Sequence, residues 1–98
     1  MAATAKNVSR TVAVGNGAAT AFDARDAFPI HGPQNLRVTV VHATAIVSVA
    51  WNGITAPAPG AGDDHVHVGP FGTILVPWVN TLSLRSDTAA TPVEVAVA

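Results

Sequence analysis

Residues 36–42 read Leu-Arg-Val-Thr-Val-Val-His, and residues 46–51 read Ile-Val-Ser-Val-Ala-Trp. In both stretches apolar side chains recur at every second position, which is the pattern of a β-strand with one buried face. The buried faces would carry these side chains: Leu36, Val38 and Val40 from the first stretch, and Val47, Val49 and Trp51 from the second. The two stretches therefore predict two strands that contribute to one apolar core.

The same period of two continues along most of the chain. It recurs at residues 8–14, 18–23, 65–68, 82–85 and 93–97, whereas no segment shows the apolar stripe of a long helix. One helical turn fits between Asp23 and Phe28, where Pro29 would end it.

Turn-forming residues separate these stretches. Gly15-Asn16-Gly17 and Asn52-Gly53 are typical of tight hairpins with positive φ, and the second would start a return strand at Ile54-Thr55. Residues 56–62 are rich in Pro and Gly and predict a loop, and Gly69-Pro70 predicts a further turn.

The pattern as a whole predicts an all-β chain, a small antiparallel β-sandwich or jelly-roll-like domain of about eight short strands. We assign residues 8–98 to this single domain and residues 1–7, which do not alternate, to a flexible N-terminal arm. The expected core consists of Phe22, Leu36, Val38, Val40, Val47, Val49, Trp51, Leu82, Leu84, Val93 and Val95.

Composition narrows the function classes. Only 11% of the 98 residues are charged, against about 25% in a typical soluble domain, so intrinsic disorder is excluded. The chain has no Cys for a disulfide framework and a net charge of −1, which gives no footprint for nucleic acid. No apolar run is long enough for a membrane helix, and the first ten residues lack a signal-peptide core, so we expect synthesis in a cytoplasm. So few charges favour a subunit covered by other subunits, with a simple bias toward Ala as the alternative.

The densest ionisable cluster is Asp63, Asp64, His65 and His67. On a strand the two His rings would share one face, and two imidazoles can bind zinc or nickel with added carboxylate oxygens. A third protein ligand that a catalytic zinc site needs is not visible, so a polar face beside a solvated loop is favoured. We assign no metal and no other cofactor.

No catalytic residue stands out. Asp23 and Asp26 form a carboxylate pair, but Arg25 lies between them and the segment is typical of a solvated connection. No serine has the surrounding glycines of a nucleophile elbow. Trp51 is in register with the core, whereas Trp78 follows Pro77 in a loop and suits a surface contact, including a sugar platform. We therefore expect a protein that is not an enzyme.

Three stretches together resemble a pattern in virion proteins of tailed bacteriophages. They are residues 12–22, Val-Ala-Val-Gly-Asn-Gly-Ala-Ala-Thr-Ala-Phe, then Phe28-Pro29-Ile30, then residues 36–40. The match covers roughly a third of the chain, and its Gly-Asn-Gly hairpin motif is also found in tail-fibre attachment segments. The small size and the absence of Cys are similar to head-decoration, or cement, proteins.

The resemblance implies a non-enzymatic capsid decoration subunit of the virion. Such a subunit would bind the major capsid protein or other virion subunits as a homotrimer, without nucleic acid or membrane. The alternatives are a tail-fibre or appendage attachment module, and a cellular small β-domain that binds a ligand or metal. An attachment domain would precede a long shaft, so the end of the chain at Ala98 favours a free-standing subunit.

The candidate interaction residues come from three places. Lys6 and Arg10 would dock the arm on an acidic capsid surface. His65 and His67 would meet their copies at a symmetry axis, where protonation below about pH 6 would loosen the interface. The alternative is that both rings lie in water. Trp78 would contact a partner from its loop.

Overall fold

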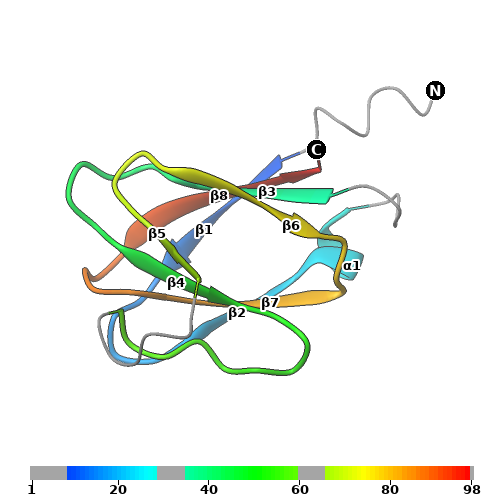
Figure 1. Cartoon of the computed structure of the whole chain (residues 1–98), viewed down its shortest axis with the longest axis horizontal. Coiled ribbons are helices and arrows are strands. Elements are labelled where there is room, and N and C mark those ends of the chain that lie inside the picture. Colours follow the sequence, from blue (N-terminus) through cyan, green and yellow to red (C-terminus); the bar gives the residue numbers. More distant parts are fainter. Residues whose placement is uncertain (1–8, 29–34, 60–65, 98) are drawn as a thin grey trace.

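The structure, a computed structural model, describes residues 9–28, 35–59 and 66–97 (Figure 1). Their elements are, in order, β1 (Ser9–Val14), β2 (Thr20–Asp23), α1 (Ala24–Ala27), β3 (Asn35–Val40), β4 (Val47–Ala50), β5 (Val66–Val68), β6 (Thr73–Pro77), β7 (Thr81–Ser86) and β8 (Thr91–Val97).

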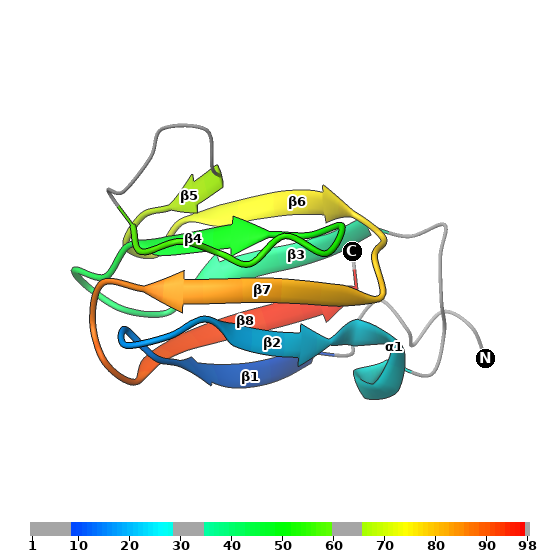
Figure 2. The same ribbon diagram turned by 90° about the horizontal axis from the view of Figure 1, so that it is seen from below.

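The strands form two antiparallel sheets of four, in the orders β1-β8-β3-β6 and β2-β7-β4-β5. The pairing is nested, because β1 pairs with β8, β2 with β7, β3 with β6 and β4 with β5. This is the strand order of a jelly roll, in which a long hairpin is rolled so that its successive pairs fall alternately into two facing sheets. Figures 1 and 2 show the two layers. The predicted all-β sandwich is confirmed.

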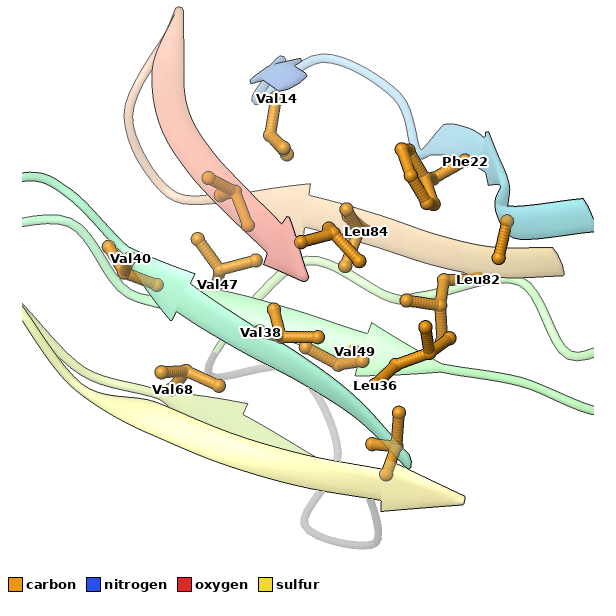
Figure 3. Packing of buried hydrophobic residues seen from close by; sticks show 14 of the residues in the cluster. Val14, Phe22, Leu36, Val38, Val40, Val47, Val49, Val68, Leu82 and Leu84 are labelled. Atoms are coloured by element: carbon orange, nitrogen blue, oxygen red, sulfur yellow. The ribbon is translucent and has the colours of Figure 1, made fainter. Parts of the chain in front are cut away.

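The core lies between the two sheets, where apolar side chains from both layers point toward one another (Figure 3). Every predicted core residue is buried there except Trp51, which is half-buried and packs against the cluster. Alternation decides this, because each strand with one face on the core buries every second side chain. The burial pattern of β7, in which Leu82 and Leu84 alternate with more exposed residues, is one example.

The connection at Gly15-Asn16-Gly17 is not the predicted hairpin. It carries the chain from one sheet to the other, since β1 pairs with β8 and β2 with β7. Neither glycine has a positive φ. The ladder with β8 matches all of β1 from Ser9 to Val14, whereas β2 is only four residues long, so the distant strand is the better partner.

The turn at Asn52-Gly53 is present, with φ values of 62° and 79°, but the predicted return strand at Ile54-Thr55 is not. Both edges of β4 are already taken, one by β5 and the other by β7. Residues 54–59 instead cross the outer face of that sheet. There the buried Ala56 donates its N–H to Ser83 Oγ at 2.9 Å.

Helix α1 is the single turn expected between Asp23 and Phe28. Asp23 is its N-cap, and Oδ1 accepts the N–H of Asp26 at 3.1 Å. Phe28 ends the helix and packs its ring 5.8 Å from that of Phe22. Asp23 therefore holds a helix end, a role that the solvated-connection interpretation did not include.

Candidate interaction surface

Arg10 is the basic residue of the proposed docking pair that the structure places. It lies in β1 with its guanidinium 5.9 Å from the centre of the Phe28 ring, and it donates to the carbonyl oxygen of Ser9 at 2.9 Å. A guanidinium over an aromatic face is a cation–π contact. Arg10 thus covers one end of the core. Lys6, and the whole predicted arm at residues 1–7, lie outside the described residues.

His67 lies in β5, exposed, opposite Ser48 of β4. β1 and β5 are outer strands of different sheets, at opposite sides of the sandwich, so Arg10 and His67 do not share a surface (Figure 2). His65, Asp63 and Asp64 lie outside the described residues.

Trp78 is half-buried in the connection between β6 and β7 and packs against the core. It also lines an open depression of about 720 Å³, together with Asn52, Gly53, Val79, Asn80 and Thr81. The aromatic side chain and the polar side chains around it give this depression both stacking and hydrogen-bonding groups.

The most exposed apolar side chains lie elsewhere, on a feature that sequence reasoning missed. β5 and β6 are the outer strands of the two sheets on one side of the sandwich, and residues 69–72 join them (Figure 2). Val66, Phe71 and Leu75, which we call the β5–β6 edge, are 39%, 66% and 60% exposed. Phe71 and Leu75 exceed all other large apolar side chains of the described residues in exposure.

Phe71 is held in a turn whose backbone does not suit it. Gly72 donates its N–H to the carbonyl oxygen of Gly69 at 2.9 Å, so Pro70 and Phe71 are the central residues of a β-turn. The φ of Phe71 is 53°, as in a type II turn, where glycine is the preferred third residue. A left-handed conformation costs an L-residue about 1–2 kcal/mol. Such strain concentrates at functional sites.

A side chain at Gly72 would be crowded by its neighbours. A Cβ there would lie 3.0 Å from the carbonyl oxygen of Gly69 and 3.1 Å from Cγ1 of Val68. The close approach explains why glycine occupies the fourth position of this turn.

The edge is also free of formal charge. Residues 66–84 include no Asp, Glu, Lys or Arg, and β6 itself reads Thr-Ile-Leu-Val-Pro. Natural sheet edges are usually protected by charged side chains, by proline or by a covering segment. Within residues 9–28, 35–59 and 66–97, the only one of these devices found at β6 is Pro77, at its end.

A row of polar residues crosses the sheet β2-β7-β4-β5, where His67, Ser48 and Arg85 are neighbours on β5, β4 and β7. Arg85 donates to the carbonyl oxygen of Asn16 at 3.2 and 3.3 Å. Ser48 is fully buried, and its Oγ has no hydrogen-bond partner within the described part of the chain. The Ser48–His67 pair therefore lacks the hydrogen bond on which serine nucleophiles depend.

Residues 9–28, 35–59 and 66–97 bring no three His, Asp or Glu side chains into a group that could hold a metal ion. Over the same residues, no helix is long and apolar enough to cross a membrane. No protein-family model matches the chain, and no curated protein matches it at a significant level.

Proposed function

We propose that the protein is a non-enzymatic structural subunit that binds other protein subunits through the β5–β6 edge, as a decoration subunit on a phage head. The observation that carries the proposal is the exposure of Phe71 and Leu75 on an uncharged edge. Centres of protein interfaces are depleted in charge and enriched in aromatic side chains. The strained backbone of Phe71 supports the same role, because the chain keeps an aromatic residue where glycine would fit more easily.

The partner class rests on the resemblance carried by residues 12–22, 28–30 and 36–40. It supports a location in the virion, an oligomeric subunit, and the major capsid protein or another virion subunit as the partner. Jelly rolls are common in viral capsid proteins, but also in lectins and cupins, so the fold agrees with this role without selecting it.

The proposal is tested by electron microscopy of the phage particles released from cells that produce this protein. Antibody-labelled protein should appear by electron microscopy on phage heads. The double variant Phe71→Asn/Leu75→Ser should lose the label, because Asn tolerates the positive φ of the turn while both apolar side chains are removed. The matched control is Ile54→Ser, since Ile54 is 55% exposed but lies outside the edge. Label on tails only, on no particle, or lost equally in the control would overturn the proposal.

A second candidate function is favoured by the depression at Trp78. Its aromatic side chain, with Asn52, Asn80 and Thr81 nearby, suits a small polar ligand such as a sugar, which would stack on the ring and hydrogen-bond to its neighbours. Binding of the labelled protein to an immobilised glycan series, lost on Asn80→Ala and kept on Phe71→Asn, would favour this candidate over the first.

A further inference from the structure

The hydrogen-bonding direction of β6 follows from a single backbone contact. β6 bonds to β3 on one side, in the register Thr39 opposite Thr73 and Val38 opposite Ile74. Val40 donates its N–H to the carbonyl oxygen of Gly72 at 3.0 Å. Residues of an antiparallel strand face one neighbour alternately, so the register places Ile74 and Val76 in hydrogen bonds with β3.

The residues that alternate with Ile74 and Val76 face outward. Thr73, Leu75 and Pro77 direct their main-chain polar groups to the free side of the sheet, where the described residues place no further strand. Thr73 and Leu75 supply N–H donors there. Pro77 has no N–H and occupies a position where none is needed for the ladder with β3. The edge thus presents the main-chain pattern that an added antiparallel strand requires.

We propose that β6 pairs antiparallel with β6 of a second copy across a two-fold axis, joining two four-stranded sheets into one. This deepens the proposed function, on which it rests for the use of the β5–β6 edge as an assembly surface. The pairing that uses both free donors places Thr73 opposite Leu75 of the second copy. The two-fold axis repeats this pair, so each Thr73 and each Leu75 both donates and accepts.

A two-fold axis would place β6 beside the same strand of a second copy, and the composition of β6 suits this. Like charges would then oppose one another, but β6 has no charged residue. The same register brings Phe71 toward Pro77 of the second copy, and both residues are exposed in the single chain. The pairing therefore places Leu75 beside Thr73 and Phe71 beside Pro77 of the second copy, and it also satisfies the outward backbone groups of β6.

The first test is sedimentation of the purified full chain at micromolar concentration. We expect a mass of two copies. Leu75→Pro removes the N–H that faces the free edge and leaves the β3–β6 ladder intact, so it should weaken pairing about tenfold or more. The matched control is Leu75→Ala, which removes the same side chain but keeps the N–H, and it should weaken pairing less. Thermal unfolding checks that both variants remain folded.

The second test is the register. The chain has no Cys, so introduced thiols are unique. Directly opposite residues of a hydrogen-bonded pair lie about 5.5 Å apart at Cα, within the range that a disulfide spans. When the Thr73→Cys and Leu75→Cys variants are mixed and mildly oxidised, a disulfide should join one copy of each variant. This product should form in preference to disulfides between two copies of the same variant.

Three results would each overturn the pairing. The parent chain could be a monomer, Leu75→Pro and Leu75→Ala could dimerise equally well, or the parent chain could be a trimer that Leu75→Pro leaves unchanged. The particle experiment fails separately. If the protein is a dimer but is never found on phage heads, the decoration role is overturned and the pairing is supported. If the protein is found on heads but is a monomer, the pairing is overturned and the decoration role is supported.

Discussion

At Phe71 the cost of backbone strain can be measured separately from the contribution of the side chain to stability. Its φ is 53°, and its side chain is 66% exposed. Phe71→Ala keeps the strain of the left-handed conformation and removes the ring. Phe71→Gly removes both. The difference between the two variants therefore reports the backbone alone.

The magnitudes follow from the exposure and the dihedral angle. Full burial of a Phe side chain stabilises by about 1.5–3 kcal/mol, and about a third of this side chain is covered, so Phe71→Ala should cost about 0.5–1 kcal/mol. Glycine relieves about 1–2 kcal/mol of strain but loses about 0.5–1 kcal/mol in backbone entropy. The Gly variant should exceed the Ala variant in stability by roughly 0.5–1 kcal/mol, or about 2–8 °C in Tm.

The assay is urea unfolding of the two variants, at a concentration low enough that each chain is alone, because association would add its own stability. Gly17 is the control site. Its φ is not positive, and nothing lies within 4 Å of an added Cβ, so Gly17→Ala should stabilise by about 0.4–1 kcal/mol. Glycine should thus be preferred over alanine at residue 71 and disfavoured at residue 17. The same preference for alanine at both sites would refute the strain argument.

Three further predictions concern single contacts, each read by urea or thermal unfolding. Ser48→Ala should be neutral or stabilise by up to about 1 kcal/mol, because it removes a buried hydroxyl without a partner among the described residues. Ser83→Ala should cost about 1 kcal/mol, because the N–H of Ala56 loses its acceptor. Equal effects of the two substitutions would contradict this assignment of the Ser48 hydroxyl. Asp23→Ala should cost about 1 kcal/mol by removing the N-cap of α1, and Asp23→Asn, which still caps, should recover most of it; no recovery would mean that charge rather than capping matters. Gly72→Ala should destabilise by about 1–3 kcal/mol through overpacking against Gly69 and Val68, and a neutral result would show that the turn can shift to admit the Cβ.

Local pattern was sufficient for most of the strands and for the buried faces of β3, β7 and β8. Alternation at Leu36–Val40 and at Leu82–Leu84 states which side chains point inward, because neighbouring residues of a strand lie on opposite faces. The Asn52-Gly53 turn was equally readable, since both of its residues adopt positive φ. Phe28 escaped the predicted core because it follows a helical turn and belongs to no alternating run.

The pairing of the strands could not be read from local pattern. Alternation is the same whichever strand lies alongside, so residues 8–14 carried no sign that their partner is β8, far along the chain, rather than β2. For the same reason the return strand at Ile54-Thr55 looked plausible until both edges of β4 were seen to be occupied. The β5–β6 edge is the clearest case. Residues 66–77 read as two more strands of a sandwich, and their exposure at Phe71 and Leu75 arises because β5 and β6 are outermost, which depends on how every other strand has paired.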